Sequence, residues 1–169
     1  MGIRHMTTHA GFIPEPTDPR YSGVIERIGK VADALHAAGC TMGLETGQES
    51  AAVLLQVMKD LGRDFVSANF DPANFVLYGS DDPVHAAQVL AGRVKMAHMK
   101  DGLPSARPGA DWGEDVPPGK GKVDFPAVLK ALFDGGFTGP LIIEREAGND
   151  RAGDLVAAKK FLERVLARM

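Results

Sequence analysis

The stretch that decides the fold is Val94-Lys95-Met96-Ala97-His98-Met99-Lys100-Asp101. It begins as an apolar run and ends in ionisable residues, and the alternation of a strand places Met96, His98 and Lys100 on one face. Active sites of α/β barrels lie at the C-terminal ends of their parallel strands, so they require buried strands with ionisable tips. We therefore interpret residues 94–101 as a strand that delivers functional groups to such a rim.

Three other segments share this shape, because each is a short apolar run that ends in a carboxylate. They are residues 41–45, 65–71 and 141–144, which end in Glu45, Asp71 and Glu144. Strand ends on one edge of a parallel sheet converge, so we expect these carboxylates to meet His98. A single carboxylate at a strand end would be unremarkable, because such a residue is commonly solvated or caps a helix. A single histidine is likewise commonly structural. Their equivalent placement in successive units favours a shared site.

Three carboxylates and an imidazole would repel or remain poorly solvated together unless a cation held them. This mixture of oxygen and nitrogen donors suits Mn²⁺, Mg²⁺, Co²⁺ or Zn²⁺. Two of the carboxylates are also able to transfer protons, because a bound metal acidifies hydroxyls and stabilises an enediolate. The pattern therefore predicts a metal site with acid/base chemistry.

Strand and helix alternate along the chain about five times, at roughly 30 residues per unit, which predicts a parallel α/β sheet in a single domain over residues 1–169. Expected strands cover residues 3–8, 41–45, 65–71, 93–99 and 141–145; expected helices cover residues 24–38, 49–61, 83–91, 125–134 and 155–168. Ser22 is the expected cap of the first helix and Asp82 of the third. The first strand lacks a glycine-rich phosphate turn, which disfavours a nucleotide-binding sheet. A complete barrel needs about 250 residues, so a barrel here is incomplete.

Two segments between these elements are expected to be irregular. Residues 72–75 and 79–82 are interpreted as a loop, and residues 101–121 as a long Pro- and Gly-rich loop without periodicity. A loop of that length in a compact domain is usually a lid or a binding loop. Trp112 within it is expected to cover either a ligand or the rim of the sheet.

Composition excludes several classes of protein. The net charge of −3 offers no basic surface for nucleic acid or an anionic membrane, and no apolar run approaches a membrane span. The first eight residues lack the apolar core of a signal peptide. The single cysteine, Cys40, fits a reducing compartment. We expect a cytoplasmic protein whose partner is a small molecule, with no nucleic acid and no membrane.

Five other polar residues are also considered. His9 ends the first strand at the same edge as the metal set and is expected to contact substrate or metal. His36 and His85 lie within helices and are expected at the surface. Lys100 with Asp101 is interpreted either as a substrate contact or as a surface ion pair.

Several phrases of the sequence together resemble the xylose isomerase-like TIM-barrel superfamily of sugar phosphate isomerases and epimerases. The matching phrases are residues 43–49 (Gly-Leu-Glu-Thr-Gly-Gln-Glu), 69–74 (Asn-Phe-Asp-Pro-Ala-Asn), 97–102 (Ala-His-Met-Lys-Asp-Gly), 112–125 and 139–146. Their order is similar to that of the family's fifth to eighth strands, and residues 9–11 resemble the end of its fourth strand. The resemblance covers essentially the whole chain.

This resemblance implies a divalent metal, with manganese as the first expectation, held by Glu45, Asp71, His98 and Glu144. It implies that Glu45 and Glu144 are also the acid/base pair: one removes a proton beside the carbonyl and the other returns a proton on the opposite face. It makes His9, Asn74, Lys100 and Arg145 candidate contacts to a sugar or sugar phosphate.

The chain departs from the family pattern in two ways. Lys120 stands where many relatives carry glutamate, and the family's first three βα units have no counterpart. Without those units the outer strands have open edges, which favour association, so we expect a homodimer or larger oligomer. Three alternatives remain open: a zinc-dependent nuclease of the same superfamily acting on damaged DNA, a half-barrel without activity, and a dehydratase or isomerase acting on another polyol.

Overall fold

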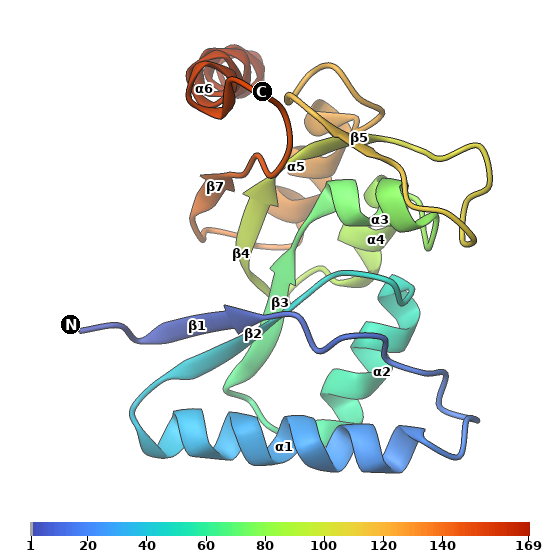
Figure 1. Ribbon diagram of the computed structural model, residues 1–169. Helices are drawn as coiled ribbons and strands as arrows, with labels where there is room; N and C mark the ends of the chain where they lie inside the picture. Colours follow the sequence, from blue (N-terminus) through green and yellow to red (C-terminus); the bar gives the residue numbers. More distant parts are fainter. Residues whose placement is uncertain (1) are drawn as a thin grey trace.

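A computed structural model describes residues 2–169 and shows five parallel strands curled into half of a barrel (Figure 1). The strands are β1 (His5–Thr8), β2 (Thr41–Glu45), β3 (Val66–Phe70), β4 (Val94–Met99) and β7 (Leu141–Ile143). Each strand pairs with the next one in this order. The predicted incomplete barrel of parallel βα units is therefore confirmed.

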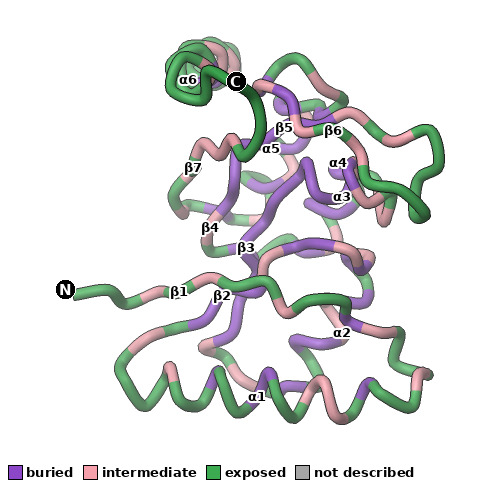
Figure 2. The backbone as a smooth tube through the Cα atoms, viewed as in Figure 1, coloured by how far each residue is buried: buried purple, intermediate pink, exposed green. Residues whose placement is uncertain are grey.

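Six helices connect and surround the strands. They are α1 (Tyr21–Ala37), α2 (Ala51–Leu61), α3 (Pro72–Tyr78), α4 (Pro83–Val89), α5 (Phe125–Asp134) and α6 (Arg151–Leu166). Alternate strand residues such as Met42, Leu44 and Phe70 are at most 1% exposed and form the core with the helices. The buried backbone runs along β3 and β4, whereas β1 is more exposed (Figure 2). The remaining strand residues, including the polar set, face the interior of the half-barrel.

The expected loop at residues 72–75 is wrong, because these residues begin α3. Asp71 is its N-cap: Oδ1 accepts hydrogen bonds from the amides of Ala73 (2.8 Å) and Asn74 (3.3 Å). Pro72 follows at the first helical position, where its missing N–H costs nothing. The same Asp-Pro signal correctly predicted the start of α4 at Asp82 and Pro83.

The segment 101–121 is not wholly irregular, since it contains a hairpin of β5 (Asp101–Leu103) and β6 (Glu114–Val116). Asp101 holds this segment in place. Its fully buried carboxylate accepts hydrogen bonds from four backbone amides, those of Gly102, Gly119, Gly121 and Val123, at 2.8–3.1 Å. The interpretation of Lys100 and Asp101 as a surface ion pair is wrong, because both side chains are buried and Asp101 bonds to backbone amides.

Three helix starts also differ from expectation. Helix α2 begins at Ala51 rather than at residue 49, and Ser50 caps it. Helix α1 begins at Tyr21 and has no side-chain cap, so the predicted role of Ser22 is wrong. Helix α6 begins at Arg151, four residues earlier than expected, because Asp150 caps it by accepting a hydrogen bond from the Gly153 amide at 3.0 Å.

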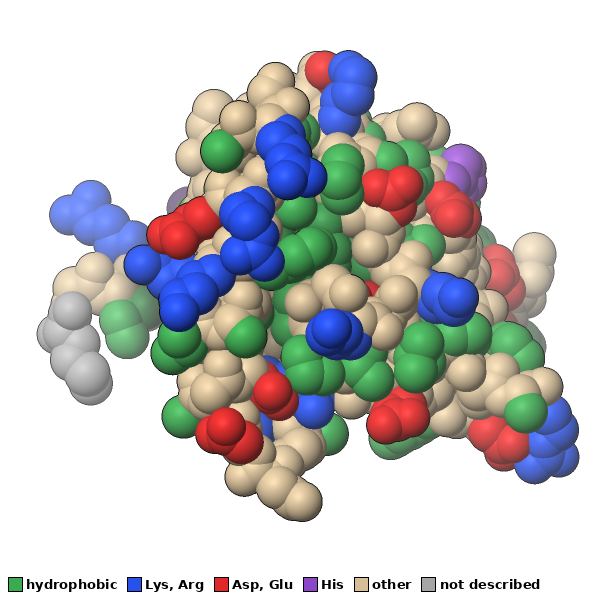
Figure 3. Space-filling view, turned by 90° about the horizontal axis from the view of Figure 1, so that it is seen from above, with side chains coloured by type: hydrophobic (Ala, Val, Ile, Leu, Met, Phe, Trp, Pro, Cys, Tyr) green, Lys and Arg blue, Asp and Glu red, His purple; other side chains and the backbone are tan. Residues whose placement is uncertain are grey.

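The outer surface carries both signs of charge. Seen from above, several lysine and arginine side chains lie close together beside a central apolar area, and aspartate and glutamate side chains are scattered around them (Figure 3). Within residues 2–169, no helix has the length and apolarity needed to cross a lipid bilayer. Strands β1 and β7 lie at the two ends of the sheet, so each is paired along one edge alone within the described chain.

Candidate metal centre

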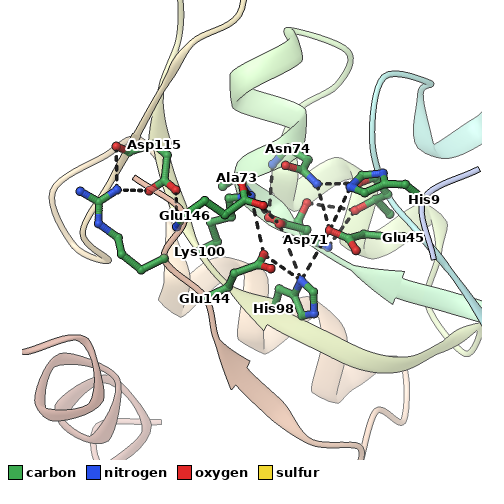
Figure 4. Close-up of polar contacts among 12 residues, drawn as sticks. His9, Glu45, Asp71, Ala73, Asn74, His98, Lys100, Asp115, Glu144 and Glu146 are labelled. Carbon is green, nitrogen blue, oxygen red and sulfur yellow. Dashed lines mark hydrogen bonds and ion pairs between the residues drawn. The ribbon is translucent and has the colours of Figure 1, made fainter. Parts of the chain in front are cut away.

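The ends of four strands bring Glu45, Asp71, His98 and Glu144 together at one rim of the half-barrel (Figure 4). Glu45 ends β2, Asp71 follows β3, His98 lies near the end of β4, and Glu144 follows β7. One potential ligand atom from each residue lies within 4.8 Å of the others. These four residues are separated by up to 99 positions in sequence, so the sheet alone assembles them.

The His98 ring is the centre of this group. Its Nδ1 lies 3.0 Å from Glu144 Oε2, 3.5 Å from Glu45 Oε1 and 3.9 Å from Asp71 Oδ2. Asp71 is fully buried, and His98 is 8% exposed. Three acidic oxygens therefore converge on one buried ring nitrogen.

Three atoms in this group have unused bonding capacity. Asp71 Oδ2, His98 Nδ1 and Glu144 Oε2 are buried and have no hydrogen-bond partner among residues 2–169. Buried polar atoms without partners are uncommon because each carries a desolvation cost. All three face the same point, and three carboxylates with one imidazole form a donor set that divalent cations accept. The residues present therefore fit a divalent metal ion.

The protonation states reflect the crowding of charge. Burial opposes the charged form of His98, yet its contacts with Asp71, Glu144 and Glu45 raise its pKa to about 11. Burial also opposes the charged form of Glu45, but His9 and His98 hold its pKa at about 2. Burial raises the pKa of Asp71, and contact with His98 lowers the pKa of Glu144. In the metal-free protein, the protonated ring of His98 thus balances part of the negative charge of the three carboxylates.

Lys100 supplies a second positive charge from the strand that carries His98. Its Nζ lies 3.6 Å from both Asp71 Oδ2 and Glu144 Oε2, and 2.6 Å from Glu146 Oε2. The residue is only 2% exposed. Its ammonium group therefore points into the cluster, close enough to contact a ligand bound there.

Asn69 and Asn74 surround the cluster with amide groups. Asn69 Nδ2 lies 3.2 Å from His98 Nε2, and Asn69 Oδ1 has no partner among the described residues. Flipping the Asn69 amide would let its Oδ1 accept a hydrogen bond from the Nε2–H group of His98. His98 Nδ1 would then be free to bind a metal. Asn74 donates to Glu45 Oε1 at 3.4 Å and to the Thr46 carbonyl at 2.9 Å. Asn69 was missed from the sequence, although it lies two residues before Asp71 on the same strand face.

His9 and Arg145, two of the predicted substrate contacts, have different surroundings. His9 Nε2 lies 3.2 Å from Glu45 Oε1, and its side chain is 44% exposed, so it borders the cluster. The Arg145 guanidinium instead binds Asp115 and Asp154 and is 7% exposed. The structure thus brings His9, Asn74 and Lys100 to the cluster (Figure 4). Arg145 is held by other partners, Asp115 and Asp154.

A further acidic residue, Glu49, lies next to this rim and was missed by sequence reasoning. It is 7% exposed, and its Oε1 has no partner among the described residues. Burial raises its pKa to about 7. It lines a groove of about 1090 Å³ between the segment that follows β1 and the start of α2. The sequence places Glu49 at the start of an amphipathic helix, where an acidic side chain is usually exposed, so nothing in the pattern indicated its burial.

Residues 1–165 match the family model of the xylose isomerase-like TIM barrel, so the chain belongs to this family. Among solved structures, a xylose isomerase domain protein from Planctomyces limnophilus is 36% identical with a TM-score of 0.87, covering 95% of this chain and 57% of that one. The resemblance inferred from the motifs is thereby confirmed.

Two more distant relatives have named activities. An inosose dehydratase from Lacticaseibacillus casei is 26% identical over 168 residues, which cover 89% of this chain and 56% of the relative. The structure of an L-ribulose 3-epimerase shares the fold, with a TM-score of 0.75 and 21% identity over 98% of this chain and 62% of that one. The chain therefore spans a little over half the length of these relatives.

Proposed function

We propose that this chain carries the metal centre of a sugar-modifying enzyme that isomerises or epimerises a sugar or sugar phosphate. The observation that carries the proposal is the convergence of three buried atoms that make no hydrogen bond among the described residues, Asp71 Oδ2, His98 Nδ1 and Glu144 Oε2, with Glu45 beside them. The dehydratase and the epimerase among the relatives support an enzyme that acts on sugars. Manganese is the metal we propose first; magnesium, cobalt and zinc also suit this donor set.

A bound divalent ion would supply positive charge that polarises the substrate carbonyl and makes the C–H group beside it more acidic. Glu45, Asp71, His98 and Glu144 would hold it. The four side chains come from neighbouring strands, so they approach one point from a single curved rim. Asp71 and His98 serve in this proposal as ligands alone.

Glu45 and Glu144 are the proposed acid/base pair. They come from β2 and β7, with β3 and β4 between them, so they approach His98 from opposite sides. One carboxylate removes the proton beside the carbonyl, and the other delivers a proton to the opposite face of the same carbon. Removal and return on opposite faces invert that carbon, which is an epimerisation.

Lys100, Asn74 and His9 are the proposed substrate contacts. The Lys100 ammonium points into the cluster and is suited to stabilising negative charge on a substrate oxygen. The Asn74 amide and His9 ring flank Glu45 and can hold substrate hydroxyls near it. Arg145 has a smaller part in this proposal, because Asp115 and Asp154 occupy its guanidinium.

Proton transfer can be tested separately from complete turnover. The Mn²⁺-loaded protein is incubated in D₂O with a panel of ketoses and ketose phosphates, and NMR follows deuterium entering the carbon beside the carbonyl. We expect exchange with the native chain and a loss of at least 100-fold in Glu45→Gln and Glu144→Gln, in line with the usual worth of general acid/base catalysis. His85→Ala, on the exposed side of α4, is the control. Equal exchange in the glutamine variants would contradict their roles.

A further inference from the structure

Asp115 joins the β5–β6 hairpin to the chain that follows β7. Its Oδ2 accepts hydrogen bonds from the amides of Glu146 (2.9 Å) and Ala147 (3.3 Å). Its Oδ1 and its backbone carbonyl both accept from Arg145 Nη1. The Asp115 side chain thus binds three consecutive residues, 145–147, that lie about 30 positions further along the chain.

This segment carries two groups of the candidate site. Glu144 precedes it and contacts His98 at 3.0 Å, and Glu146 within it contacts Lys100 at 2.6 Å. Strand pairing fixes the segment only weakly. Strand β7 has three residues and pairs with β4 alone, and the last bond of that ladder, from the Glu144 amide to the Met99 carbonyl, is 3.4 Å long. The hydrogen bonds to Asp115 begin where the ladder ends.

Asp115 is itself held firmly. It pairs with Gly102 in the hairpin, directly beside the buried Asp101 that accepts four backbone hydrogen bonds. On the other side, Arg145 Nε donates to Asp154 Oδ2 at 2.8 Å, which ties the same segment to α6. A chain of contacts therefore runs from the end of β4, through the hairpin, to the residues after β7.

We propose that Asp115 is a positioning residue, which holds Glu144 against His98 and Glu146 against Lys100. The inference rests on the proposed function, because Glu144 and Lys100 are the proposed ligand and substrate contact. Without the Asp115 side chain, the amides of Glu146 and Ala147 lose their acceptor, and Arg145 Nη1 keeps only the backbone carbonyl of residue 115. The segment that carries Glu144 is then held by the short edge strand and by the Arg145–Asp154 contact. Residues that orient metal ligands from outside typically change metal affinity by 10–100-fold when removed.

The test uses Asp115→Ala and Asp115→Asn, with Asp111→Ala as the matched control. Asp111 lies in the same hairpin but is exposed and pairs with Arg107 at 2.7 Å. Hydrogen exchange of the metal-free protein, followed by mass spectrometry, is read over residues 141–149. We expect faster exchange there in Asp115→Ala, a smaller change in Asp115→Asn, which keeps a neutral acceptor, and none in Asp111→Ala.

Mn²⁺ affinity is then measured by calorimetry on the same proteins, well below their unfolding temperatures. We expect it to fall by roughly 10–100-fold in Asp115→Ala and to be unchanged in Asp111→Ala.

Unchanged hydrogen exchange in both Asp115 variants overturns the inference. Faster exchange with unchanged affinity also overturns it, because Asp115 would then be purely structural. If the native chain binds no Mn²⁺, the proposed function fails, while the exchange data still decide whether Asp115 fixes residues 144–147. If Asp115→Ala does not fold, Asp115→Asn carries both measurements.

Discussion

Asp71 performs two tasks with its two oxygens. Oδ1 caps α3 through the amides of Ala73 and Asn74, and Oδ2 faces the candidate metal centre without a partner among the described residues. The cap fixes the side chain, so Oδ2 is aimed before any ligand arrives. Asp71 thus combines a structural contact, through Oδ1, with a candidate metal contact, through Oδ2.

Metal binding should release a proton from His98. Its pKa of about 11 in the metal-free protein means that it is protonated at neutral pH, whereas a ligating imidazole must be neutral. We expect Mn²⁺ affinity to rise roughly tenfold per pH unit between pH 6 and 8. Calorimetry in two buffers of different ionisation enthalpy would count the protons released. Affinity that does not change over this range would contradict the assignment of His98 as a ligand.

Glu49 should weaken the fold as the pH rises. Burial raises its folded-state pKa from 4.5 to about 7, so the neutral acid is favoured in the native protein. Its contribution to stability is complete below pH 4.5 and is lost as the pH rises through 7, to a total of about 3 kcal/mol. Glu49→Gln stays neutral, so its free energy of unfolding relative to wild type should be higher at pH 8 than at pH 4.5.

Urea unfolding at both pH values measures this difference. Glu15→Gln is the control, since Glu15 is an exposed acid on the same groove. If Glu49→Gln shifts stability equally at the two pH values, the carboxyl does not titrate in this range.

At the scale of elements, the parts visible in the sequence are those set by local patterns. Periodicity predicted the five strands and most helices, and the strand ends predicted where Glu45, Asp71, His98 and Glu144 would lie. The hairpin β5–β6 was not visible, because Asp101 organises it through amides up to 22 residues away. Glu49 and Asp115 escaped for the same reason, since burial and partners distant in sequence define them. Helix α3 is different, because its start at Asp71-Pro72 carries the same local Asp-Pro signal as the start of α4.

Asp101→Asn should loosen the hairpin. The asparagine side chain has one oxygen in place of two, so its amino group would face backbone N–H donors that Asp101 now satisfies. Each buried donor left without a partner costs about 1–3 kcal/mol, so we expect a loss of about 3 kcal/mol in urea unfolding. Proteolysis within residues 103–113 should also accelerate. Stability equal to that of Asp111→Asn would contradict this role.

At the scale of the whole molecule, the half-barrel leaves two sheet edges, at β1 and β7, without a neighbour among the described residues. Exposed strand edges offer unpaired N–H and C=O groups to another chain. Apolar side chains are exposed on both edge strands, with Met6 at 46% and Ile142 at 38%. We propose that a second copy of the chain covers these edges.

Light scattering after gel filtration tests this proposal. We expect a dimer or larger assembly at micromolar concentration, and dissociation in Ile142→Lys, because a charge on an edge strand opposes pairing. Trp112→Lys is the control, since Trp112 is 69% exposed but lies in the hairpin loop, away from both edges. A monomer at all concentrations, with Ile142→Lys indistinguishable from it, would contradict the proposal.

The central claim is that residues from four strands hold one divalent ion. Calorimetric titration of the metal-stripped protein with Mn²⁺ tests it most directly, with His98→Ala and the surface variant His85→Ala beside the native chain. We expect one ion to bind per chain, with unchanged affinity in His85→Ala and an affinity at least 100-fold lower in His98→Ala. No binding to the native chain, or binding that survives in His98→Ala, would contradict it.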